Sequence, residues 1–345
     1  MALFSKDLGI DLGTTYTRIS EGGVVILEEP TVVTIAVEEQ MIVEVGKAAQ
    51  EMYGRVSDRL EVTRPLQNGV VARYEVTENL IRYLIKKVSG PLAFFRPRIM
   101  ITVPYGITSV ETRAVHEAAL GAGSREAYLI HQPLAAALIH QPLAAALGAD
   151  LPVGTPSGNM VVSLGGGCSQ AAVIAMNSIV AADTLRAGGM ELDEAIISYV
   201  RKKYGLIIGQ PTAEQVKIKI GAAVPQDQDK SIEIQGQDQV TALPRPLVLT
   251  TGEIVDAVRD VLKDIIETVR RVLEKTPPEL VSDTIDRGIA LCGGGALLPG
   301  IEKLMTKELG IPTYLVDNPM TCIAEGASRA LEIYPTLRRN LPNVN

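Results

Sequence analysis

Two segments, one in each half of the chain, share a pattern that limits the folds open to it. The first, IDLGTTYTRIS, begins at Ile10, and the second, VSLGGGCSQAAVI, begins at Val162. Each reads as a strand, a short turn of small residues and a second strand. The pattern predicts two related halves whose turns face each other across a cleft.

Strand and helix patterns alternate along the rest of the chain. Gly22-Gly23 separates two β-rich runs as a hairpin turn, and VTENLIRYLIKKV has the spacing of a helix with one apolar face. From Thr250 a long amphipathic helix runs to a stop at Pro277-Pro278. The alternation predicts the α/β class, and 345 residues are long for one core. We therefore expect two lobes, over residues 1–150 and 151–345.

Charge and cysteine content exclude several classes of function. The formal net charge is −7, and no block of Lys and Arg is present, so we expect no nucleic-acid partner. The three cysteines, Cys168, Cys292 and Cys322, are widely spaced, which predicts reduced thiols and a cytoplasmic location. The first residues lack the pattern of a secretory signal, which agrees with a cytoplasmic location.

A glycine- and threonine-rich turn between buried strands lets backbone N–H groups approach an anion closely. The turns at residues 13–16 and 165–169 have this character, and hydroxyl groups add further donors. Taken singly, each turn is better explained as a tight hairpin that binds nothing.

Three motifs resemble those of the superfamily of actin, sugar kinases and heat-shock chaperone ATPases. DLGTTYTR resembles its first phosphate motif, SLGGGCSQ lies where the second belongs, and LCGGGALLPGI resembles its adenosine motif. Longer stretches resemble the MreB family of bacterial actins, among them RPLQNGVVARYEVTENLIRYLIKKV and GGMELDEAIISYVRKKYGLIIG. The resemblance covers nearly the whole chain. It implies an actin-like bilobed fold around a nucleotide cleft, with ATP and Mg²⁺ as cofactors.

The same resemblance assigns the residues of the nucleotide site. They are Gly13, Thr14, Thr15 and Tyr16 and Gly165, Gly166 and Gly167 at the phosphates, Glu214, Gln215, Val216 and Lys217 at the nucleoside, and Gly293, Gly294, Gly295, Ala296 and Leu297 at the adenine and phosphates. Tyr16 departs from the family, which usually has Asn there. From the residues alone, a surface ion pair is the preferred explanation of Glu214 and Lys217.

The chain also departs from the family at the catalytic positions. Asp11 matches a carboxylate that holds hydrated Mg²⁺ through water, but Ser163 replaces the Asp expected in the second half, and Cys168 and Gln170 replace Thr and Glu. Because Mg²⁺ sites depend on carboxylates and phosphates, a hydroxyl is a weaker partner. We predict that nucleotide binding is retained and that hydrolysis is slow or lost.

The nine residues IHQPLAAAL occur twice in succession, from Ile130 and from Ile139, within residues 130–147. The family has one copy, with Glu where the two copies have Gln132 and Gln141, and either glutamine could orient water. A continuous helix would displace the second copy by roughly 13 Å. Because Pro142 disfavours this, we expect a PLAAALI helix, a break near Ile139 and a PLAAALGA helix. The short tether to the upstream strand favours Gln132.

Large apolar residues lie near the N-terminus and in a loop bounded by prolines. They are Phe4 and, in residues 91–97, Leu92, Phe94 and Phe95. Such patches mark interaction sites, and the family resemblance implies contact with the inner face of the cell membrane. The alternative is a loop that folds back onto its own lobe.

These features predict an MreB-like cytoskeletal protein that sets cell shape. It would bind ATP, assemble with itself into filaments at the inner face of the cell membrane, and organise the cell-wall synthesis machinery. Two enzymes of the same superfamily remain as alternatives: a small-molecule kinase, which needs a further catalytic carboxylate, and a chaperone-type ATPase.

Overall fold

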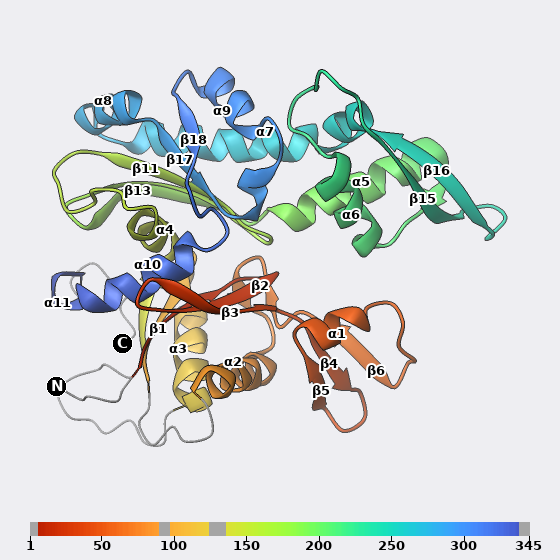
Figure 1. Ribbon diagram of the computed structural model, residues 1–345, viewed down its shortest axis with the longest axis horizontal. Helices are drawn as coiled ribbons and strands as arrows, with labels where there is room; N and C mark the ends of the chain where they lie inside the picture. The colour runs from red at the N-terminus through yellow and green to blue at the C-terminus, as the bar shows by residue number, and fades with distance from the viewer. Residues whose placement is uncertain (1–5, 90–96, 124–135, 338–345) are drawn as a thin grey trace.

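The structure is a computed structural model that describes residues 6–89, 97–123 and 136–337. Within these ranges two five-stranded sheets form the centres of two lobes, and each lobe carries a smaller sheet at one end (Figure 1). The α/β class and the two-lobed arrangement predicted from the sequence are therefore confirmed.

The sheet of the first lobe has the order β10-β9-β1-β2-β3. Strands β1, β9 and β10 are parallel, whereas β2 and β3 are antiparallel to their neighbours. Buried residues of helices α2 and α3 join the main apolar core of this lobe. The elements are β1 (Asp7–Leu12), β2 (Tyr16–Glu21), β3 (Val24–Pro30), α2 (Tyr74–Ser89), β9 (Arg98–Val103), α3 (Ser109–Gly123) and β10 (Ala136–His140).

The smaller part of the first lobe follows β3. It contains the sheet β5-β4-β6, the short helix α1 and the hairpin of β7 and β8. These elements are β4 (Val33–Ala36), β5 (Met41–Val45), α1 (Lys47–Glu51), β6 (Leu60–Thr63), β7 (Leu66–Gln67) and β8 (Val70–Val71).

The sheet of the second lobe has the order β13-β12-β11-β17-β18, which repeats the arrangement of the first. Its strands are β11 (Asn159–Leu164), β12 (Ser169–Ala175), β13 (Ser178–Leu185), β17 (Ile289–Cys292) and β18 (Thr313–Leu315). The remaining elements are α5 (Gly189–Tyr204), β14 (Leu206–Ile207), α6 (Gln210–Ile220), β15 (Ser231–Asp238), β16 (Pro244–Thr250), α7 (Thr251–Lys275), α8 (Pro278–Arg287), η1 (Gly294–Leu297) and α9 (Ile301–Leu309).

Local sequence explains most of these boundaries. Every residue of β11 and β12 is buried, as expected for central strands covered on both faces. Thr250 and Glu253 form a reciprocal capping box at the start of α7, and Pro278 starts the next helix. The predicted hairpin turn is present, with positive φ at both Gly22 and Gly23.

Two short helices lie between the lobes (Figure 1). They are α4 (Gln141–Gly148) and α10 (Cys322–Glu332), and α11 (Tyr334–Leu337) follows α10. Their apolar residues share one core with residues from both large sheets, including Met100 and Val161. Helix α10 belongs to the C-terminal half of the chain but packs against β1 of the first sheet. The boundary between the lobes at residue 150 stays a prediction. Helix α10 shows that a segment from the C-terminal half of the sequence can pack against the sheet of the first lobe.

The tandem repeat does not form two helices. The expected PLAAALI helix is wrong, because Ala136–His140 is strand β10 and pairs in parallel with β9. Edge pairing with β9 and burial of Ile139 override the helix propensity of the alanines. The expected break is confirmed in position, since α4 begins at Gln141 with Pro142 in its first turn.

Candidate functional site

The two predicted turns meet in the structure. A β-carbon on Gly166 would overlap the side chain of Thr15, and one on Gly167 would overlap Oγ1 of Thr14. Glycine is therefore required at both positions for the turns to approach this closely. The prediction that the turns face each other is confirmed.

Neighbouring backbone and side chains hold the first turn in place. Oγ1 of Thr14 accepts a hydrogen bond from the backbone N–H of Gly69 at 2.9 Å, and the carbonyl of Thr15 accepts one from Thr31 at 2.8 Å. The guanidinium of Arg64 donates to the same Thr15 carbonyl at 3.3 Å. The ring of Tyr16, the residue that departs from the family, lies 5.3 Å from the guanidinium carbon of Arg18. The turn is thus preorganised by the protein itself.

The predicted adenosine bend packs directly on the second turn. Gly293 has φ +85°, and a β-carbon there would overlap the carbonyl of Leu164, the last residue before the turn. Gly295 also approaches Leu164, with its β-carbon position 2.9 Å from that of Leu164. Gly294 starts the short helix η1, in which Ala296 is buried and Leu297 is exposed. Two motifs that lie far apart in the sequence therefore form one continuous surface.

The second turn is backed by the start of α5. The carbonyl of Gly165 accepts a hydrogen bond from Gly189 at 2.9 Å, and that of Gly166 accepts one from Met190 at 2.8 Å. Nζ of Lys217 donates to the carbonyl of Gly189 and forms an ion pair with Asp193, both at 2.7 Å. Burial raises the pKa of Asp193 to about 6, although the charge of Lys217 opposes the shift.

The four residues predicted on α6 have different environments. Glu214 is half-buried near Asp193, and its charge also acts on Arg64 of the first lobe. Val216 is fully buried in the core of the second lobe, whereas Gln215 is exposed. The side chain of Val216 therefore serves packing. Lys217 lies beside the start of α5, which backs the second turn, and its ion-pair partner is Asp193 and not Glu214.

Asp11 is buried at the end of β1. Its Oδ1 accepts hydrogen bonds from Oγ1 of Thr102 at 2.9 Å and from Nε2 of Gln141 at 3.4 Å. Burial raises the pKa of the Asp11 carboxyl, and the nearby charge of Arg18 opposes this rise. Asp11 is thus a carboxylate within a small polar network.

The network continues into the second lobe through two glutamines. Oε1 of Gln141 accepts a hydrogen bond from Nε2 of Gln170, and Oε1 of Gln170 accepts one from the backbone N–H of Tyr105 at 2.8 Å. Ser163 is buried and lies opposite Gln170 in the pairing of β11 with β12. The structure places Gln141 at this point, whereas the sequence favoured Gln132, which lies outside the described residues.

The charge at this site is low. Burial and the charge of Asp11 raise the pKa of Cys168 to about 12, so this thiol is neutral. The described residues contain no group of three or more His, Cys, Asp or Glu side chains placed to hold a metal. One carboxylate, Asp11, with neutral amides beside it fits a Mg²⁺ ion held through water and by phosphate, but not a closed protein site.

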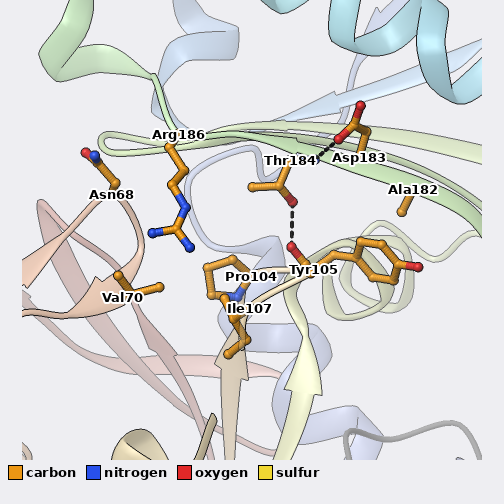
Figure 2. Close-up of a pocket in the computed structure, with 10 residues that line it drawn as sticks. Asn68, Val70, Pro104, Tyr105, Ile107, Ala182, Asp183, Thr184 and Arg186 are labelled. Atoms are coloured by element: carbon orange, nitrogen blue, oxygen red, sulfur yellow. Dashed lines mark hydrogen bonds between the residues drawn. The ribbon is translucent and has the colours of Figure 1, made fainter. Parts of the chain in front are cut away.

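A small cavity of about 160 Å³ lies between the lobes beside this network (Figure 2). It is lined by the hairpin of β7 and β8, by the loop after β9, and by β13 with the residue that follows it. Oγ1 of Thr184 donates to the carbonyl of Tyr105 at 2.8 Å, and the guanidinium of Arg186 pairs with Glu111 at 3.1 Å. The volume is below that of typical small-molecule pockets. Tyr105 links this cavity to Gln170 and so to Asp11.

The sequence did not identify Thr102, Tyr105 and Asp193 as parts of the site. Asp193 had a detectable signal in the sequence, because its spacing from the apolar Ile196 and Val200 places all three on one helical face. The structure shows that all three are buried. Thr102 and Tyr105 reach the site through strand pairing and a loop, for which the sequence has no local signal.

The predicted membrane-contact residues all lie outside the residues that the structure describes: Phe4, Leu92, Phe94 and Phe95. Among the helices of the described ranges, none combines the length and apolar character needed to cross a bilayer.

Comparison with known proteins agrees with this geometry. A family model described as MreB/Mbl protein matches residues 5–339. Cell shape-determining protein MreB of Pasteurella multocida is 44% identical over 340 residues, which cover 96% of this chain and 94% of the relative. Cell shape-determining protein Mbl of Bacillus subtilis is 39% identical over 331 residues, which cover 96% and 97%.

Solved structures show the same fold. The crystal structure of MreB5 of Spiroplasma citri bound to ADP has a TM-score of 0.88 at 28% identity and covers 97% of this chain and 99% of its own. A MamK double helical filament has a TM-score of 0.75 at 21% identity, with 94% and 98% covered. The chain therefore belongs to the MreB/Mbl family of actin-like, cell shape-determining proteins.

Proposed function

We propose that this chain binds ATP between its two lobes and assembles into filaments at the inner face of the cell membrane, where it organises cell-wall synthesis. The observation that carries the proposal is the meeting of the turns at residues 13–16 and 165–169, with the Gly293 bend packed on Leu164. Backbone N–H groups of closely packed glycine turns suit an anionic phosphate chain.

Solved relatives support nucleotide as the ligand. MreB5 of Spiroplasma citri has been solved with ADP and with AMPPNP, in both cases with a TM-score of 0.88 to this chain. By this likeness, the turns would hold the phosphates and the surface of Gly293 and η1 would contact the adenine.

Titration with labelled ATP and Mg²⁺ tests the binding step. Saturable binding, with competition by unlabelled ATP and ADP, is expected of the purified chain. An absence of saturable binding across millimolar nucleotide would contradict the proposal.

Hydrolysis is proposed to be slow or absent. A Mg²⁺ ion that arrives with ATP would be held through water by Asp11 and would neutralise phosphate charge. The second half offers Ser163 in place of a carboxylate, and Gln141 can orient water by hydrogen bonding but cannot remove its proton. The polar network around Asp11 therefore favours binding over turnover.

Filament assembly is proposed from family membership. Head-to-tail contacts between two different faces of an actin-like subunit propagate as an open fibre. Sedimentation with ATP, with ADP and without nucleotide tests this: pelleted polymer that depends on nucleotide is expected. A chain that stays in the supernatant under all three conditions would contradict the filament while leaving ATP binding untouched.

A further inference from the structure

Helices α4 and α10 cross with their backbones in direct contact. A β-carbon on Gly148 would overlap the carbonyl oxygen of Cys322, and one on Gly326 would overlap the carbonyl oxygen of Ala144. Both obstacles are backbone atoms of buried helices, so neither can swing aside as the end of a flexible side chain can. The crossing therefore requires glycine at position 148.

This requirement distinguishes the two copies of the repeat. In the structure the second copy supplies the end of β10 and most of α4, and Gly148 follows it directly. The residue that follows the first copy is Ile139. If the first copy formed this strand and helix, a branched side chain would stand where no β-carbon fits.

Two further residues after Gly148 also favour the second copy over the first. Asp150 has φ +55° and pairs with Arg329 of α10 at 2.5 Å, and the backbone N–H of Leu151 donates to the carbonyl of Ala146 at 3.0 Å. In the alternative register Gln141 would occupy the position of Asp150, so the ion pair would be lost. Pro142 would occupy that of Leu151, and proline has no N–H to donate.

The backbone pairing of the strand before α4 does not distinguish the two copies. Strand β10 is held to β9 by parallel backbone pairing from Ala136 to His140. Backbone donors and acceptors of this kind are supplied by any residue other than proline. The described contacts that distinguish the two copies are therefore those made by the residues that follow.

We infer that Gly148, supported by Asp150 and Leu151, selects the second copy of the repeat, so that the chain holds one register and presents Gln141 beside Asp11. The selection rests on helix packing and does not depend on the proposed nucleotide binding. Gly148 is thus a positioning residue for the amide at the centre of the site.

Thiol labelling of matched positions in the two copies tests the register. Leu143 is 1% exposed in the core between the lobes, and Leu134 is its counterpart in the first copy. The native cysteines are buried, and the unsubstituted chain measures their background. In the folded full-length chain, the thiol of Leu143→Cys is expected to react at least about 100-fold more slowly than in denaturant, and more slowly than that of Leu134→Cys. Protection at position 134 instead, or two kinetic phases at position 143, would overturn a single register.

Substitution of Gly148, where α4 crosses α10, tests whether the close helix contact requires glycine. Gly148→Ala is expected to lower the Tm by roughly 5 to 10 °C, because the added carbon forces two packed helices apart. Gly154→Ala is the matched control, since the nearest atom to its β-carbon is 3.6 Å away. Equal Tm values for the two variants would remove Gly148 as the selecting residue.

Discussion

Nε2 of Gln141 donates a hydrogen bond to Oδ1 of Asp11 at 3.4 Å, although the two residues come from opposite ends of the first lobe's sequence. The contact follows from three adjacent parallel strands. Asp11 lies near the end of β1, Thr102 near the end of β9, and Gln141 directly after β10. Carboxyl ends of parallel strands share one edge, which is where α/β sheets bind their ligands.

Ser163→Asp is expected to increase phosphate release from ATP by roughly tenfold or more. The substitution restores a carboxylate in the second lobe, and a lowering of the barrier by 1.4 kcal/mol is worth about a factor of ten. Single-turnover phosphate release measures the effect. In the control variant Ser163→Asn the new side chain has the shape of Asp without its charge, so the rate of phosphate release should stay unchanged. An equal rise in both variants would exclude a metal-directed role for the added carboxylate.

Gly167→Ala should weaken ATP binding by about tenfold or more. Its β-carbon would overlap Oγ1 of Thr14, which the N–H of Gly69 holds in place, so the two turns must separate. Gly252→Ala is a suitable control, because the nearest atoms to that β-carbon are 3.9 Å away. Isothermal titration with ATP compares them, and unchanged affinity in Gly167→Ala would show that the turn contact does not shape the site.

Asp193 should make the protein less stable as the pH rises from about 4 to about 6. Its pKa is about 6 in the folded chain against an ordinary 3.8, so in this window the folded state binds more protons than the unfolded state. The contribution of Asp193 to the free energy of unfolding therefore falls by up to about 3 kcal/mol as the pH rises. Denaturant unfolding at several pH values measures this contribution as the difference in slope between the unsubstituted chain and Asp193→Asn, in which the fall with pH is expected to be smaller. Asp256→Asn, in an exposed pair with Arg259, is the control that should retain the slope.

Phe94→Ala/Phe95→Ala is expected to reduce binding to vesicles that contain anionic lipid. The segment PLAFFRP combines two large apolar side chains with Arg96, and such a combination favours a lipid surface. Flotation of the full chain with vesicles measures the loss. If the variant floats as well as the unsubstituted chain, the membrane contact lies elsewhere or does not exist.

Much of the architecture could be predicted from sequence because its signals are local. The strand, turn and strand units at Ile10 and Val162, the α7 capping residues and the hairpin glycines all encode their structure within a few residues. The family resemblance of the same motifs implied the site roles of Asp11 and the glycine turns. Thr102 and Tyr105 could not be predicted, because strand pairing and a loop bring them to Asp11 and Gln170.

The repeat shows where local information ends. The sequence contains two identical copies of IHQPLAAAL, each able to supply a glutamine, and the short tether upstream favours the first. Packing between distant segments selects the second. Helix α10 lies so close to α4 that position 148 has no space for a β-carbon, and glycine stands there only when the second copy forms the strand and helix. Steric exclusion between segments far apart in the chain, which no local pattern records, placed Gln141 at the site.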